Sequence, residues 1–507
     1  MKALKNIFII LLAILSINSC TDLEETIYSD ITTDNFYNNE QECLLAVGNV
    51  YASLRQTNSL WGAYSAQELA TDEAVIPLRN AGYSLNNNGI FLQMHWHQFT
   101  PYLNLCQGPW DLYYSVASKC NDVLGAIESS EATFDSKESL IAELKTVRAF
   151  AYYNLIDLYG NIPVVLDPSD KDLPEQLTRQ EAYDLVEADL LENIDKLEAV
   201  PSSTNYGRAT QTFAYMILAK MYLNSEEWLG SARYSDVVTM CNNIITSGYY
   251  SLEENYFNNF IINNMNSSEN IFMIPYDRTV DSWGFVHHVI GLPASLSAKY
   301  GYNIAWNGIC APPEFYNLFD PADSRINSFE VGPQFDFSGN PVIGIDGNQL
   351  TFTNTISNIL NAGEGEGARF FKYEYPLGLQ WLQSMDNDWA VYRYSDVLLM
   401  KAEAIMRQNG GVANQDAVDL VNIVRERAFG DQSGNYTAAT LTLDELLDER
   451  GRELAWEGHR RQDQIRFGTF DDAWFEKEAW TDDHKKLYPI PASPLLANPN
   501  MEQNPGY

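Results

Sequence analysis

The sequence predicts a mostly α-helical fold, in which a scaffold of paired helices carries an inserted lobe rich in loops and short strands. On both sides of the middle of the chain, apolar residues recur every three or four positions, as at Ala182, Val186 and Leu190, which is typical of amphipathic helices. Between about residues 247 and 389 this period fades and Asn, Gly, Tyr and Phe dominate, which favours loops and short strands. We therefore expect one large domain whose helical scaffold covers about residues 35–246 and 390–470.

The expected helices come in pairs joined by short turns. Before the lobe, one helix follows the apolar residues from Ala214 to Met221, and the next covers about residues 234–245 and ends near Gly248. After the lobe, a helix from about Tyr394 ends at Gly410-Gly411, and its partner covers about residues 417–427. Helix pairs of this kind, with small residues at close contacts, predict a tetratricopeptide-like scaffold of degenerate repeats.

The first twenty residues predict an export signal and a lipid anchor. Lys2 and Lys5 precede an apolar run over residues 7–15 and then small polar residues that lead to Cys20, which is the pattern of a signal peptide. The run is too short to span a bilayer, which needs about 20 apolar residues. The stretch Ile-Asn-Ser-Cys that ends at Cys20 resembles a bacterial lipobox, so residues 1–19 are the expected signal peptide and Cys20 is the expected site of lipidation, where acyl chains would hold the protein to a membrane.

Charge and cysteine content exclude several classes of function. The chain has a net charge of −36, and such a surface repels nucleic acid because that partner needs Lys and Arg to displace counterions. The same charge disfavours strongly anionic polysaccharides, although a local Arg could rescue their binding. Five cysteines besides Cys20 stand at wide spacings without a CxxC pair, which predicts neither a zinc site nor a disulfide framework and leaves one oxidised pair open.

Motifs of catalysis and of metal binding are absent from the sequence. It contains neither HExxH nor GxSxG. His95 and His97 would share one face of a strand, but no third ligand accompanies them, so we expect no metal and no cofactor. Carboxylates are abundant enough that a glycosidase pair stays open, because sequence alone does not measure the separation that such chemistry needs.

Four motifs, in order along the chain, carry a family resemblance. They are RAFAYYNL with LYGNIP (residues 148–163), YRYSDVLLM with AEA (392–404), ERGRELAWEGHRR (449–461), and YPIP with NPN and QNPGY (488–507). Together with the lipobox, they resemble the SusD/RagB family of outer-membrane nutrient-uptake lipoproteins over Cys20 to Tyr507. Within these motifs, mixed charges at helical spacing predict a buried ion-pair network; its members are Arg393, Glu403, Glu453, Glu457 and Arg460. His459 is expected to be a hydrogen-bonding core residue.

The resemblance implies a role as well as a fold. Proteins of this family are anchored by lipid to the outer membrane, face the cell surface, cap a TonB-dependent (SusC-like) transporter barrel, and bind oligosaccharide or polysaccharide without catalysis. Some relatives bind peptides instead. The resemblance therefore implies a non-catalytic glycan-binding lipoprotein that passes its ligand to the transporter.

Candidate binding residues lie in three loops that combine aromatic and polar side chains. Sugar binding needs an aromatic plane against the apolar face of a pyranose, with amides, carboxylates or Arg around it. The candidates, which lie roughly where the family builds its glycan site, are Arg79, Asn80, Tyr83, Trp283, Tyr302 and Trp306. A starch-binding relative has a Trp in the first loop where this chain has Leu78, so Tyr83 is the expected substitute. Each Trp could instead belong to the core, as we expect for Trp96 and Trp110, and Trp381 is a weaker candidate.

Three classes of function remain at this point. A glycan-binding protein leads, a secreted glycoside hydrolase comes second, and a structural surface or fimbrial protein comes third. Incubation with a panel of glycans separates them by retention without cleavage, by cleavage, or by neither.

Overall fold

The computed structural model describes residues 36–80, 84–167, 169, 172–381 and 383–507. Its helices are α2 (Glu40–Ser53), α3 (Ala63–Glu68), α4 (Ile90–His95), α5 (Asn104–Ser129), α6 (Lys137–Tyr159), α7 (Arg179–Asn193), α8 (Gln211–Leu229), α9 (Tyr234–Thr246), α10 (His287–Gly291), α11 (Ala294–Tyr300), α12 (Pro313–Tyr316), α13 (Tyr394–Gln408), α14 (Gln415–Phe429), α15 (Leu443–Leu454), α16 (Arg460–Phe467) and α17 (Ala492–Ala497). Its strands are β1 (Ile162–Pro163), β2 (Gln176–Leu177), β3 (Asn270–Ile274), β4 (Phe329–Glu330), β5 (Gly332–Pro333), β6 (Thr351–Phe352), β7 (Arg369–Phe370) and β8 (Trp389–Arg393). The expected cysteine anchor and signal, Cys20 and residues 1–19, lie outside the described residues, and so does Tyr83.

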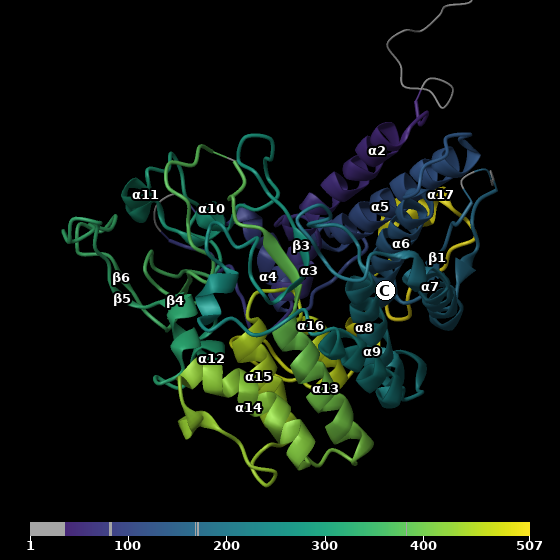
Figure 1. The fold of residues 1–507 in the computed structure, drawn as a ribbon. Helices are drawn as coiled ribbons and strands as arrows, with labels where there is room; N and C mark the ends of the chain where they lie inside the picture. The colour runs from purple at the N-terminus through teal and green to yellow at the C-terminus, as the bar shows by residue number, and fades with distance from the viewer. Residues whose placement is uncertain (1–35, 81–83, 168, 170–171, 382) are drawn as a thin grey trace, which may run out of the picture.

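The long helices pack in neighbouring pairs, as the sequence predicts. Helix α5 packs on α6 and α6 on α7, while α8 packs on α9 and α13 on α14 (Figure 1). Local signals define their ends: Thr178 and Glu181 form a capping box at the start of α7, and Gly230 and Gly430 adopt the left-handed conformation that ends α8 and α14. The mostly α-helical, tetratricopeptide-like fold is confirmed.

The lobe between α9 and α13 has short elements and long connections (Figure 1). The five-residue strand β3 pairs antiparallel with β8, which also has five residues and continues directly into α13, so that it connects the lobe to the scaffold. Strand β4 pairs with β7 and β5 with β6, each over two residues. The lobe also contains the short helices α10, α11 and α12, which the sequence pattern did not predict because each lasts only one or two turns. His287 and His288 lie in α10.

A buried ion-pair network joins the lobe to the C-terminal helices, and this prediction is confirmed. Arg393 at the end of β8 is fully buried and lies 3.0 Å from Glu269, 3.0 Å from Glu453 and 2.6 Å from Glu457. The other predicted members also pair, Glu403 with Arg466 at 2.6 Å and Arg460 with Asp72 at 2.8 Å. Each carboxylate has a cation against it, which is the condition under which buried charge is tolerated.

The pKa values inside this network follow from burial opposed by charge. Burial alone would raise the pKa of Glu449, but the guanidinium groups of Arg325, Arg452 and Arg425 outweigh burial and lower it to about 2. His459 is buried, as expected, and its Nδ1 lies 3.4 Å from Nζ of Lys220. Burial and that ammonium lower the pKa of His459 to about 3, so the imidazole is neutral near pH 7.

The remaining cysteines are packing residues. Cys43, Cys106, Cys120, Cys241 and Cys310 are all buried and unpaired, and burial raises the pKa of the Cys106, Cys120 and Cys241 thiols. Across the described ranges, no helix is both long and apolar enough to cross a membrane.

Candidate functional site

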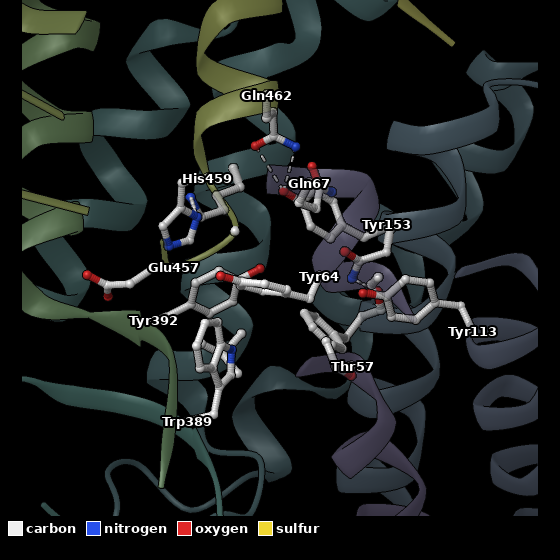
Figure 2. Close-up of a pocket in the computed structure, with 16 residues that line it drawn as sticks. Thr57, Tyr64, Gln67, Tyr113, Tyr153, Trp389, Tyr392, Glu457, His459 and Gln462 are labelled. Carbon is white, nitrogen blue, oxygen red and sulfur yellow. Dashed lines mark hydrogen bonds between the residues drawn. The ribbon is translucent and has the colours of Figure 1, made fainter. Parts of the chain in front are cut away.

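A small cavity lies where the scaffold meets the C-terminal motifs. Helix α3 contributes Tyr64 and Gln67, α6 contributes Tyr153, and the loop before α16 contributes His459. Figure 2 shows these side chains around the cavity, and at one end the hydroxyl of Tyr153 donates a hydrogen bond to Gln462. Its volume is about 60 Å³, whereas sites for small organic ligands measure about 300–1,000 Å³. This cavity is thus too small for a sugar. The aromatic residues predicted to bind sugar, Trp283, Tyr302 and Trp306, belong instead to the lobe.

On the lobe, Trp283 presents its indole to solvent. Its side chain is 38% exposed, and its backbone adopts a left-handed conformation with φ of 64°, which is rare for a bulky residue and costs on the order of 1–3 kcal/mol. The next residue must be glycine, because a Cβ on Gly284 would lie 2.6 Å from the ring of Tyr276. Strain of this kind clusters at functional sites, so the turn marks Trp283 as a candidate.

Neighbouring segments hold the Trp283 turn in place. Asp281 forms an ion pair of 2.7 Å with Arg55 of the scaffold, and Ser282 pairs as an isolated bridge with Gln383. Together these contacts hold the backbone that precedes Trp283.

Trp306 lies against the exposed indole of Trp283, and Tyr302 is buried nearby in sequence. Trp306 is only 7% exposed, and its ring centroid lies 5.8 Å from that of Trp283 at an angle of 41°. Tyr302 is 6% exposed, and its hydroxyl donates to the carbonyl of Pro376 at 2.7 Å. Most of the surface of both rings is therefore covered by protein. This geometry favours a supporting role for them over direct contact with a ligand.

Trp381 adds a second exposed indole, which the sequence analysis ranked as a weaker candidate. It is 56% exposed and follows Gln380, whose side-chain oxygen accepts a hydrogen bond of 2.5 Å from Asn303. The amide of Gly378 donates to the carbonyl of Tyr300 at 2.8 Å, so this loop is attached to the one that carries Trp306. We use the name aromatic platform for the surface of Trp283, Trp306 and Trp381 with the exposed amides of Asn303 and Gln380.

Arg79 lies close to these loops but is not a free ligand for sugar hydroxyls. It is 4% exposed, and its guanidinium donates to the carbonyls of Asn307 at 2.6 Å, Gly363 at 2.7 Å and Glu366 at 2.9 Å. With its donors used by backbone carbonyls, Arg79 ties the 363–366 segment to the segment after Trp306. The geometry therefore differs from the sequence-based expectation and gives Arg79 a structural role.

Asn80 borders a polar hollow on the other side of Arg79. It is exposed, and its amide donates to the carbonyl of Asn361 at 3.2 Å. The hollow has a volume of about 370 Å³ and is lined by carboxylates, amides and hydroxyls, including Asp346, Gln349 and Thr351. Asn80 thus stays available to a polar ligand, while its predicted neighbour Tyr83 lies outside the described residues.

The histidines considered as metal ligands are each used by the protein. Nε2 of His95 lies 2.6 Å from the carbonyl oxygen of Phe475, and Nε2 of His97 lies 2.9 Å from that of Ala70. Burial lowers the pKa of His95 to about 4 and also lowers that of His97. In the part of the chain that the structure describes, no group of three or more His, Cys, Asp and Glu residues could hold a metal ion.

Comparisons with known proteins agree with these observations. Residues 369–507 match the SusD family, and residues 23–223 match a family described as starch-binding and associating with the outer membrane. A SusD-like protein of Formosa agariphila is 26% identical over 98% of this chain and 97% of its own length. The starch-binding protein SusD of Bacteroides thetaiotaomicron is 28% identical over 72% of each chain. The chain is therefore similar to SusD-type proteins over both matched segments.

Solved structures of SusD-like proteins share the whole architecture. Surface glycan-binding protein A of Bacteroides thetaiotaomicron, in complex with laminarihexaose, superimposes with a TM-score of 0.74 at 24% identity, covering 92% of this chain and 99% of that one. A SusD superfamily protein of Parabacteroides distasonis gives a TM-score of 0.75 at 22% identity, covering 94% and 100% of the two chains. At these identities the likeness establishes the fold, in which the SusD scaffold and its lobe are both present.

Proposed function

We propose that this SusD-like chain is a non-catalytic, surface-exposed glycan-binding lipoprotein of the outer membrane, which captures oligosaccharide and passes it to a TonB-dependent (SusC-like) transporter. The observation that carries the proposal is the aromatic platform. A strained turn displays Trp283 on the lobe of a SusD-family fold, beside a second exposed indole at Trp381. Relatives named as starch-binding and glycan-binding proteins support the same ligand class.

The chemistry of the platform suits a pyranose ring. An indole face packs against the apolar C–H face of a sugar, and aromatic burial of this kind dominates the energy of many binding sites. Around it, the exposed amides of Asn303 and Gln380 supply both donors and acceptors for hydroxyl groups. Two indoles on adjoining loops favour a chain of several sugar units over a single monosaccharide.

A glycoside hydrolase is the second candidate, and the charges near the platform do not favour it. Asp281 is held by Arg55 at 2.7 Å, and Asp386 accepts a hydrogen bond of 2.6 Å from Arg278. Both of these carboxylates therefore have structural partners. Incubation of the purified chain with plant and host glycans tests the choice: retention of a glycan without cleavage supports the proposal, and release of shorter products would replace it with hydrolysis.

Replacing Trp283 with alanine should weaken glycan binding without unfolding the protein. Loss of one stacking indole removes on the order of 1–3 kcal/mol of affinity, which is roughly a fivefold to more than a hundredfold increase in Kd. The melting temperature should hold, because the side chain is 38% exposed. Isothermal titration calorimetry on the glycan retained in the panel measures the affinity.

A matched control for this variant is Tyr102→Ala. Tyr102 is 82% exposed and follows Pro101, whose carbonyl accepts a hydrogen bond from Ala492 in α17, on the side of the molecule away from α10 and α11 (Figure 1). Loss of the Tyr102 ring should leave the Kd for the glycan unchanged. Equal losses from Tyr102→Ala and Trp283→Ala would show that the platform is not the binding site.

The anchor and the partner can be tested on bacterial membranes. With Cys20 acylated, the chain should fractionate with the outer membrane and, in mild detergent, co-purify with a large barrel protein; Cys20→Ala should move a folded protein into the soluble fraction, because the acyl chains supply the membrane affinity. A Cys20→Ala protein that stays with the membrane argues against the lipid anchor. Repeated recovery of the wild-type chain alone argues against the barrel partner.

A further inference from the structure

The lobe that carries the platform has few basic residues, and most of them are already used. Between residues 247 and 389 the sequence has sixteen acidic residues against five basic ones. The basic ones are Arg278, Lys299, Arg325, Arg369 and Lys372. An anionic ligand is normally held by Arg or Lys, which form charge-assisted hydrogen bonds to carboxylate or sulfate oxygens. The placement of these five side chains therefore decides which glycans the lobe can accept.

Three of the five are buried in the interior of the protein. Arg325 lies 2.7 Å from Asp323 and 2.8 Å from Glu449, with no exposed side-chain surface. Arg369 donates to the carbonyls of Glu366 and Glu364, each at 2.7 Å. Lys372 is buried against Glu457. Their charges are balanced or enclosed, and a glycan on the surface does not reach them.

The guanidinium groups nearest Trp283 are paired with carboxylates. Arg278 donates to Asp386 at 2.6 Å and to the carbonyl of Leu377 at 3.0 Å, and Arg55 of the scaffold is paired with Asp281. The charge beside the platform is thus balanced. Arg79, the remaining basic residue among the candidates, is buried with its donors on backbone carbonyls.

Lys299 is the exception, and it faces aromatic rings. Within the described part of the lobe, Lys299 and the buried Arg369 are the two basic side chains without a carboxylate at ion-pair distance, and of these two only Lys299 is partly exposed. Its ammonium lies 5.5 Å from the ring centroid of Tyr300 and 5.2 Å from that of Phe337, which are cation–π distances. The nearby polar hollow is lined by Asp346, Glu364 and Glu366 and by no basic residue.

We propose that the aromatic platform selects an uncharged glycan and rejects polysaccharides rich in uronic acid or sulfate. This inference rests on the proposed glycan-binding function and adds its substrate class. Neutral sugars are recognised by stacking and by amide hydrogen bonds, neither of which needs a cation. An anionic sugar in the same place would find no free cation, because Arg55 and Arg278 are already paired with Asp281 and Asp386. Its carboxylate or sulfate would also lie near those two carboxylates, and like charges across an interface exclude wrong partners.

Matched pairs of polymers test the charge class directly. The full mature chain is titrated with a panel of neutral polysaccharides and with the same polymers after oxidation of C6 to the uronate. We expect at least one neutral polymer to bind, with its oxidised form at least about tenfold weaker, and neutral binding to be unchanged between about 50 and 500 mM NaCl, because screening acts only on charged contacts. If the oxidised polymer binds as tightly as the neutral one or more tightly, and its binding weakens with salt, the inference that the glycan is uncharged is wrong. The proposed glycan-binding function would still stand.

Two variants sharpen the test. Asp386→Asn removes the carboxylate partner of Arg278, and we expect the oxidised polymer to gain several-fold in affinity while the neutral polymer keeps its Kd. Lys299→Gln should change neither. If Lys299→Gln abolishes binding of an oxidised or sulfated polymer, Lys299 is an anion site and the inference is wrong. Failure of every polymer, neutral and charged, would overturn the proposed function together with the inference.

Discussion

Arg393→Met is expected to destabilise the protein by about 3–5 kcal/mol, the typical cost of removing one partner from a buried ion pair. Arg393 has no exposed side-chain surface, and its guanidinium contacts Glu269, Glu453 and Glu457 at 2.6–3.0 Å. Methionine keeps the aliphatic stem but supplies no charge, so three buried carboxylates lose a shared cation. Denaturant titration followed by circular dichroism measures the shift in the unfolding midpoint.

Arg233→Met is the control for Arg393→Met. Arg233 also pairs with two carboxylates, Glu187 and Asp236, each at 2.7 Å, but its side chain is 30% exposed. Solvent screens such a pair, and exposed ion pairs contribute about 0–1 kcal/mol. If the two variants lose similar stability, burial does not account for the stability cost of removing Arg393.

The existence of this network could be predicted from sequence, but its partners could not. The spacing of Glu453 and Glu457 predicts that they share one face of a helix, and mixed charges inside apolar segments have to pair; in the structure α15 ends at Leu454, and Glu457 lies in the bend that follows it. Nothing in the sequence indicates that Glu269 and Lys372, from the lobe, complete the network. Those contacts depend on how β3 meets β8, which is a tertiary property.

The long helices were predictable for a related reason. Their apolar period and their capping residues act within a few positions of the chain, so the sequence contains the whole signal. The short helices α10 and α11 of the lobe have seven residues or fewer, too few to show a period. Their conformation is set by packing against the rest of the lobe.

The candidate site shows the same division between local and tertiary information. Trp283 beside Gly284 is a local pattern, and it stays the leading candidate for stacking on a sugar. Arg79 looks like a ligand for hydroxyl groups in the sequence, but its acceptors come from residues 307–310 and 363–366, more than two hundred positions away. Trp381 is a weaker candidate in the sequence, and it is the fold that shows its indole to be exposed.

Trp306 packs against Trp283, and Trp306→Ala is therefore expected to cost stability and affinity together. Trp306 is only 7% exposed, so its truncation opens a cavity in the core of the lobe. The loss of folding stability for a buried Trp→Ala change is typically about 3–5 kcal/mol. Glycan affinity should also fall, because the ring of Trp283 loses the neighbour 5.8 Å away. Thermal unfolding and calorimetric titration of the same preparation measure both quantities, and Trp306→Phe, which keeps an aromatic ring, should lose less of each.

A double-mutant cycle separates support from direct contact at Trp306. If Trp306 acts through Trp283, then adding Trp306→Ala to the Trp283→Ala protein should lower stability by the full amount while changing Kd little, since coupled residues are not additive. Additive losses of affinity, with a melting temperature that stays unchanged in Trp306→Ala, would mean that the indole of Trp306 touches the glycan itself. In that case Trp306 belongs to the binding surface, and more of its indole is accessible to the ligand than its 7% exposure indicates.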